Sequence, residues 1–253
     1  MSLAILEASD DLLGAERVFA YFREQLLSRK LKPGDKLMGE RELSLSLGIS
    51  RPVLREALRS LAMLGFLDIR HGKGAFVRTA DISVLADFFT FCLAQQPDIL
   101  DDVMQARIAI ECQAIRLACE RAGDSDLSRI GGHLTELMDT LHDPQAGGDA
   151  DFAFHLAIVE AARSPALLTL YQAISDLLRR SHVERRHLTV AVPGIRDYLV
   201  DAHRDVFLSI VDRNPDLAET RLREHFAIGD EFRRKSFIAA YAKAAVRRED
   251  QKR

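Results

Sequence analysis

The sequence predicts a mainly α protein in two parts, an N-terminal domain over residues 11–79 and a C-terminal domain over residues 84–240. Two observations support this. In the first part, three segments with a helical spacing of apolar residues precede a short pair of strands. From residue 84 onward, every periodic segment has the helical spacing. The second part is therefore expected to be an antiparallel all-α bundle of six to seven helices.

The first two helices are expected at residues 15–29 and 40–47. Residues 15–29 carry apolar side chains every three or four positions, which is typical of a helix with one buried face. A Lys-Pro-Gly-Asp turn at residues 32–35 separates the two segments, and Gly48 allows a tight turn into a third helix.

The third helix is amphipathic and basic. Ser50 is a natural N-cap, Pro52 is tolerated in a first turn, and Gly65 ends the segment. The apolar face consists of Leu54, Ala57, Leu58, Leu61 and Leu64. The opposite face offers Arg51, Arg55 and Arg59. Guanidinium groups on such a helix can reach guanine edges and phosphates from the major groove of DNA.

A basic hairpin follows. Residues 67–70 and 75–77 are predicted strands around a His-Gly-Lys-Gly turn, in which His71 and Lys73 supply donors for phosphate or the minor groove. Helix, turn, capped basic helix and basic hairpin in this order are typical of a winged helix-turn-helix domain. Taken singly, each arginine fits a solvated helix face equally well, and it is the ordered set that favours DNA binding.

This part of the chain closely resembles the DNA-binding domain of GntR-type bacterial transcription regulators. The matching residues are Pro33-Gly34, Leu37, Glu40-Arg41-Glu42-Leu43, Leu47 to Arg51, Leu54 to Leu58, Leu61, Gly65 and Gly72 to Val77. One departure is Met38-Gly39, where the family usually has Pro-Ser, and it weakens the N-cap of the second helix.

The resemblance implies specific DNA contacts. Arg41, Arg51 and Arg55 match residues that contact DNA in the family, and the hairpin tip at His71 and Gly72 matches the part that enters the minor groove. The DNA-binding residues expected from the pattern and the resemblance together are Arg41, Ser50, Arg51, Arg55, Arg59, His71, Gly72 and Lys73.

Composition favours a cytoplasmic protein that binds no membrane. The chain has 253 residues and a net charge of −3, yet residues 11–80 hold 13 Lys/Arg against 8 Asp/Glu, as attraction to phosphate predicts. No apolar run approaches the length of a membrane span, and the N-terminus does not have the pattern of a signal peptide. Cys92, Cys112 and Cys119 have no metal-binding spacing and are expected to be buried free thiols.

The C-terminal part is divided by prolines and glycines into candidate helices. These are expected at residues 84–95, 98–121, 124–142, 148–163, 165–185, 195–213 and 215–240. The breakers between them include Pro144, the Gly147-Gly148 pair and Pro215.

Three histidines and a carboxylate lie on core-facing positions of these helices. Asp151 and His155 are four residues apart and so share one helix face, while His203 and His225 each lie on an apolar stripe of a later helix. A single such histidine is most simply a satisfied core residue. Three of them with Asp151 favour a divalent metal site, with Zn²⁺ the first choice and Ni²⁺ or Mn²⁺ as alternatives.

This part resembles the all-helical, metal-binding FCD-type effector domain of the FadR subfamily of GntR regulators. The motifs are Arg107-Ile108-Ala109-Ile110-Glu111, Asp151-Phe152-Ala153-Phe154-His155, and the two later histidines. The resemblance implies that Asp151, His155, His203 and His225 hold the metal and that Arg107 binds a small carboxylate effector. The alternative for Arg107 is a helix-surface pair with Glu111. The other histidines, at 133, 142, 182 and 187, and the arginines at 179, 180, 185 and 186 are expected on the surface. The alternative for some of these arginines is a place at the mouth of the effector cavity.

The sequence thus predicts a non-enzymatic transcription regulator, with repression as the expected direction. A homodimer would bind a two-fold operator in double-stranded DNA and respond to a small organic acid bound at the metal site. Two alternatives stay open. One is a helical metalloenzyme with an appended DNA-binding domain, although no motif supplies a general base. The other is a DNA-binding protein with a purely structural metal.

Overall fold

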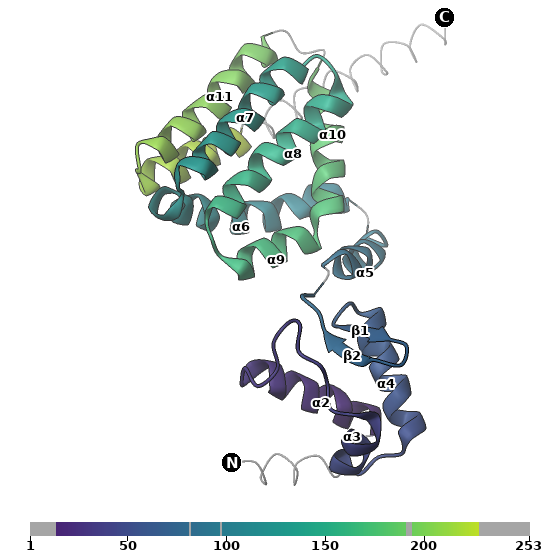
Figure 1. Cartoon of the computed structure of the whole chain (residues 1–253). Coiled ribbons are helices and arrows are strands. Elements are labelled where there is room, and N and C mark those ends of the chain that lie inside the picture. The colour runs from purple at the N-terminus through teal and green to yellow at the C-terminus, as the bar shows by residue number, and fades with distance from the viewer. Residues whose placement is uncertain (1–13, 81, 97, 191–193, 228–253) are drawn as a thin grey trace, which may run out of the picture. The chain divides into compact units, whose positions relative to one another are not determined.

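The computed structural model describes residues 14–80, 82–96, 98–190 and 194–227, mostly as helices (Figure 1). The chain forms two compact units that divide between residues 84 and 85. Each unit is built around its own set of buried apolar side chains.

The N-terminal unit has three helices and a two-stranded antiparallel sheet, as the sequence predicts. Its elements are α2 (Gly14–Leu27), α3 (Glu40–Leu47), α4 (Arg51–Met63), β1 (Leu67–Arg70) and β2 (Gly74–Val77). Leu67 pairs with Val77 and Arg70 pairs with Gly74. α4 packs against α2, α3 and β1, and its buried side chains therefore form the centre of this unit.

Two details of α4 differ from the sequence prediction. Ser50 occupies the N-cap position in an extended conformation, but its side chain makes no capping hydrogen bond. Leu64 is 38% exposed, unlike the other four members of the predicted apolar face, because the helix ends at Met63 and Leu64 lies beyond the last turn. Gly48 adopts a left-handed conformation with φ of 63°, which a glycine tolerates without strain.

The C-terminal unit is an all-helical bundle. Its helices are α5 (Ser83–Leu93), α6 (Ile99–Arg121), α7 (Asp124–Thr140), α8 (Pro144–Ala161), α9 (Pro165–Ala173), α10 (Ser175–Thr189) and α11 (Ile195–Val211), and residues 215–227 are also helical. α8 packs against α6, α7, α9 and α10 (Figure 1). Side chains that α8 directs into the bundle are therefore surrounded by other helices.

α8 begins four residues earlier than predicted, because Pro144 starts the helix rather than interrupting it. The Asp143 side chain accepts hydrogen bonds from the backbone N–H groups of Gln145 and Ala146, and a proline is tolerated in a first turn. Gly147 and Gly148 therefore lie inside the helix. Both positions need a residue without a side chain, because backbone atoms of neighbouring helices lie close to them. A Cβ atom on Gly148 would lie 2.6 Å from the Val183 Cα atom.

The predicted helix at residues 165–185 is two helices. The helical path is broken at Ile174, which has φ of −111° and ψ of 11°, although no glycine or proline marks the position. The break lets α9 and α10 each pack separately against α6 and α8, so tertiary packing outweighs local propensity. The helix predicted at residues 215–240 is present to residue 227, and residues 228–240 lie outside the described residues.

The cysteine prediction holds for two of three residues. Cys112 and Cys119 are buried free thiols, whereas Cys92 is free but exposed. Cys92 lies on α5, whose Phe88 and Phe91 side chains are also exposed, so the apolar sequence of this helix does not imply burial there. No helix in the described part of the chain combines the length and apolar character needed to cross a membrane.

The close approach of α8 and α10 gives a stability test with a matched control. Gly148→Ala should lower the free energy of unfolding by about 1–3 kcal/mol, because the new methyl group meets the Val183 backbone. Gly132→Ala, at an exposed position of α7 with open space around it, should raise it by about 0.5–1 kcal/mol. Denaturant unfolding of both variants checks the pair. Equal effects of the same sign would contradict the packing described here.

Candidate metal centre and DNA-binding surface

Asp151, His155, His203 and His225 converge inside the C-terminal unit. Asp151 and His155 lie one turn apart on α8, His203 lies on α11, and His225 lies on the helix at residues 215–227. One candidate ligand atom from each residue lies within 4.8 Å of those of the other three, and all four residues are buried. Three helices thus bring together three nitrogen donors and one oxygen donor, as the sequence predicts.

Neighbouring groups hold two of the imidazoles with Nε2 turned toward Asp151. The His203 Nδ1–H group donates to the Leu199 carbonyl oxygen at 2.7 Å, and its Nε2 atom lies 3.2 Å from Asp151 Oδ1. His155 Nε2 lies 3.3 Å from the same oxygen. Because each Nδ1 atom carries the proton, the Nε2 lone pairs are available for a metal ion.

Unpaired buried nitrogen atoms support this interpretation. His155 Nε2 and His225 Nδ1 are buried and have no hydrogen-bond partner in the described structure. A buried polar atom without a partner carries a cost in free energy, and a metal ion among these donors would remove it. The donor set fits a divalent ion that accepts nitrogen and oxygen ligands.

Glu111 on α6 is the support behind His155. Its carboxylate accepts hydrogen bonds from His155 Nδ1 at 2.7 Å, from Arg107 Nε at 2.8 Å and from the Tyr171 hydroxyl at 2.9 Å. Burial by itself would raise the pKa of Glu111, but the charge of Arg107 and the hydrogen bonds from His155 and Arg107 outweigh it and lower the pKa to about 2. Glu111 is therefore ionised and can only accept, which fixes the proton of His155 on Nδ1.

Charge and burial also set the protonation of the other donors. Burial lowers the pKa of His203 and lowers that of His225 well below its ordinary value. Burial alone would raise the pKa of Asp151, but the neighbouring His182 and His203 hold it well below its usual range. Neutral imidazole and ionised carboxylate are the forms that bind a metal ion.

His182 and Arg186 were predicted on the surface, and this was wrong. Both are buried on α10: His182 Nδ1 lies 3.3 Å from Asp151 Oδ1, and Arg186 Nη2 donates to Asp151 Oδ2 at 2.8 Å. The restart of the helix after Ile174 sets which face of α10 points inward. Leu178, His182 and Arg186 recur every four residues, and this spacing with a buried leucine was the signal in the sequence.

The remaining histidines lie at or near the surface, with His142 and His187 exposed and His133 partly exposed. Arg179 and Arg180 are exposed as well, and Arg179 pairs with Asp149 at 2.6 Å. Arg185 is only partly buried and lines the cavity described next.

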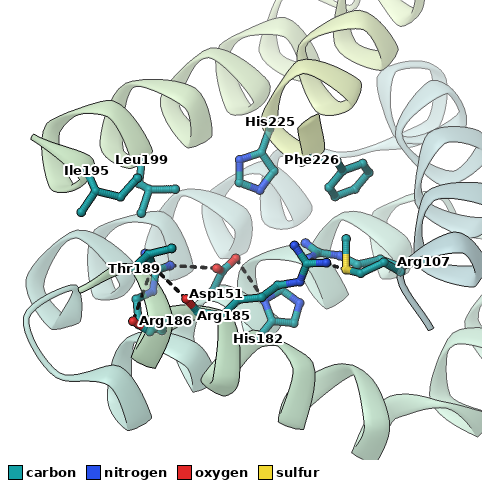
Figure 2. Close-up of a pocket in the computed structure, with 11 residues that line it drawn as sticks. Arg107, Asp151, His182, Arg185, Arg186, Thr189, Ile195, Leu199, His225 and Phe226 are labelled. Carbon is teal, nitrogen blue, oxygen red and sulfur yellow. Dashed lines mark hydrogen bonds and ion pairs between the residues drawn. The ribbon is translucent and has the colours of Figure 1, made fainter. Parts of the chain in front are cut away.

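A small cavity lies beside Asp151 and is also lined by Arg107 (Figure 2). Its volume is about 50 Å³, and its other lining residues are Met104, His182, Arg185, Arg186, Thr189, Ile195, Leu199, His225 and Phe226. The pair of Arg107 with Glu111 exists, but it is buried rather than on the helix surface. Arg107 Nη2 is buried without a partner, so one arm of the guanidinium is available to a ligand.

In the N-terminal unit, Arg51 and Arg55 are exposed on the first turns of α4, and Arg41 and Arg59 are exposed as well. Glu40, the first residue of α3, accepts a hydrogen bond from Arg55 Nε at 2.7 Å and lies 3.8 Å from Arg51 Nη2. Exposed ion pairs of this kind contribute little free energy, so either arginine can exchange Glu40 for a DNA group.

The hairpin tip is exposed at all its predicted contact residues. His71, Gly72 and Lys73 are accessible between β1 and β2. Gly72 has φ of 69° and Gly74 has φ of 103°, conformations that favour glycine and that keep the turn narrow. A narrow turn with basic side chains has a shape that the minor groove of DNA accepts.

Comparison with known proteins matches each of the two units to a described protein family or domain. Residues 14–77 match the family described as bacterial regulatory proteins, gntR family, and residues 102–227 match the FCD domain. A protein of Escherichia coli (strain K12) whose name makes it a regulator of the L-lactate dehydrogenase operon is 33% identical over 218 residues, which is 84% of this chain and 82% of that protein. This chain belongs to the GntR family.

Two further likenesses agree with this. The galactonate operon transcriptional repressor of Escherichia coli (strain K12) is 30% identical over 168 residues, covering 65% of this GntR protein and 73% of that repressor. A solved structure named Streptococcus agalactiae GntR superposes with a TM-score of 0.62 at 22% identity, covering 87% of this chain and 100% of that one, and it supports the fold alone.

The family assignment decides between the regulator and the metalloenzyme left open by the sequence. This GntR protein is a DNA-binding transcription regulator with an FCD effector-binding domain, and it is not an enzyme. The buried Asp and His cluster lies within the FCD domain and could hold a metal ion.

The Glu111 network gives a prediction about stability. Glu111→Gln removes the charge that Arg107 faces and places an amide N–H against a donor, so it should lower the free energy of unfolding by about 3–5 kcal/mol. Glu224→Gln, which weakens the exposed pair with Arg221, should change it by less than about 1 kcal/mol. Denaturant unfolding of both variants measures the difference. A Glu111→Gln variant as stable as the Glu224→Gln variant would show that the network does not support the fold.

Proposed function

We propose that this GntR regulator controls transcription in response to a small carboxylate that binds beside a divalent metal ion in the FCD domain. The observation that carries the proposal is the position of the cavity. It is lined by Asp151 and His225 of the candidate metal centre and by Arg107, which has an unpaired arm.

The metal would be held by Asp151, His155, His203 and His225. Zn²⁺ is the first choice for three imidazole nitrogens and one carboxylate oxygen, with Ni²⁺ and Mn²⁺ as alternatives. A bound ion would supply positive charge and open coordination positions for an effector oxygen. Glu111 would orient His155 from behind, as carboxylates commonly do for metal-binding histidines.

The effector would be a short hydroxy acid. Arg107 can donate its free Nη2–H to a carboxylate oxygen, and the guanidinium is held in place by Glu111 and by the Phe226 ring, 4.7 Å from its centroid. The related E. coli proteins are named for lactate and galactonate, which are both hydroxy acids. The small cavity, with a volume of about 50 Å³, favours a short acid over a sugar acid.

On DNA, Arg51 and Arg55 would read base edges in the major groove, with Ser50, Arg59 and Arg41 on the phosphate backbone. His71, Gly72 and Lys73 would enter the minor groove. A homodimer would place two such units on a two-fold operator. Repression is the expected direction, in line with the name of the galactonate relative. The acid would act by binding one dimer arrangement more tightly than another.

The first functional prediction concerns DNA. Arg51→Ala and Arg55→Ala should each cost about 1–3 kcal/mol of binding free energy on a duplex that the wild-type protein selects from random sequence. Arg23→Ala, at an exposed arginine of α2 outside the proposed contacts, is the control and should cost much less. Titration of fluorescent duplex measures all three. Unchanged affinity of the Arg51→Ala/Arg55→Ala double variant would exclude α4 as the reading helix.

The second concerns the effector. Arg107→Lys keeps a charge for Glu111 but loses the forked geometry, so it should weaken lactate binding about tenfold or more. Removing the metal with a chelator should abolish the effect of lactate on operator affinity. The control is Arg129→Lys at a partly exposed arginine of α7. Lactate titration of each protein, with and without the selected duplex, is the measurement.

Two outcomes would count against this account. An Arg107→Lys variant that binds lactate as tightly as the wild type would remove Arg107 from the site. A screen in which no short acid changes melting temperature or operator affinity, in protein shown to contain metal, would favour a purely structural metal.

A further inference from the structure

Two buried arginines line the cavity, and each has an unpaired N–H group. Arg107 donates through Nε to Glu111, and its Nη2 has no partner. Arg186 donates through Nη2 to Asp151 Oδ2 at 2.8 Å, and its Nε has no partner in the described structure. Their exposed fractions are only 3% and 4%, so solvent does not satisfy these groups. An anionic ligand in the cavity would accept hydrogen bonds from both groups.

The two arginines reach the cavity from different helices. Arg107 comes from α6 and Arg186 from α10, and Figure 2 shows them on opposite sides of Asp151. One carboxylate bound at Arg107 therefore leaves the Arg186 Nε–H group, on the other side of the cavity, without a partner.

The balance of buried charges indicates the charge of the ligand that the cavity would accept. Among the buried charged groups around the cavity, Asp151 and Glu111 are balanced by Arg107 and Arg186. A divalent metal ion bound through neutral imidazoles would add two positive charges that nothing in this set offsets. A monocarboxylate offsets one of them, and a dianion offsets both. Uncompensated buried charge is costly, and Arg185 at the cavity edge adds to the positive side.

We propose that the effector is a short dicarboxylate, with one acid group bound between the metal and Arg107 and the second bound by Arg186. This inference rests on the proposed function and narrows the class of acid. Arg186 then has two roles: it holds Asp151 through one nitrogen and binds the distal acid group through another. The small cavity volume favours a short chain between the two acid groups.

Lactate and tartronate (2-hydroxymalonate) make a matched pair of ligands, because tartronate has a carboxylate where lactate has a methyl group. Calorimetric titration of the metal-loaded full-length protein should show tartronate binding about tenfold or more tightly than lactate. In Arg186→Gln the preference should fall to about onefold. Arg179→Gln, at the exposed arginine of α10 that pairs with Asp149, should keep the preference of the wild type.

Metal content is measured in each variant, since Arg186 also contacts Asp151. Arg186→Lys keeps the positive charge and should retain a preference for tartronate. A preference lost equally in the Lys and Gln variants, or one that survives in Arg186→Gln, would overturn the role of Arg186. Equal binding of both acids to the wild type would overturn the dicarboxylate while leaving the proposed function intact. Binding of neither acid, with metal present, would count against the proposed function itself.

Discussion

The buried carboxylate of Glu111 connects most of the C-terminal unit. It accepts hydrogen bonds from Arg107 on its own helix, from His155 on α8 and from Tyr171 on α9, so three helices meet at one ionised group. Burying a charge is costly unless it is paired and hydrogen-bonded, and here the carboxylate faces a guanidinium and accepts three hydrogen bonds. The same carboxylate fixes the tautomer of one candidate metal ligand and the position of the candidate effector arginine.

Asp151 has the corresponding role on the other side of α8. One of its oxygens faces the Nε2 atoms of His155 and His203, and the other is held by Arg186. The cavity is lined by Asp151 and by Arg107, which pairs with Glu111, so a ligand there would contact a member of each system. Residues of α6, α8, α10 and α11 line the cavity, so a bound effector would contact all four helices and could bias how they pack.

Much of this could be predicted from the sequence, and the exceptions have physical causes. The helical spacing of Asp151 and His155 and the apolar stripes around His203 and His225 placed the four candidate ligands correctly on inward faces. The start of α8 was missed because Pro144 and Gly147 were interpreted as breakers, whereas Asp143 caps the helix and α7 requires the small residue. His182 and Arg186 were missed because the break at Ile174 has no glycine or proline, and it decides which face of α10 is buried.

The central claim is that the histidines form a metal centre rather than a self-contained polar core. X-ray absorption at the metal edge, on the purified full-length protein reconstituted with Zn²⁺, tests it most directly. We expect one ion per chain, with three imidazole nitrogens among its ligands. In His203→Ala at least one of these nitrogen ligands should be lost. A protein that takes up no ion, or an ion whose surroundings contain no imidazole, would contradict it.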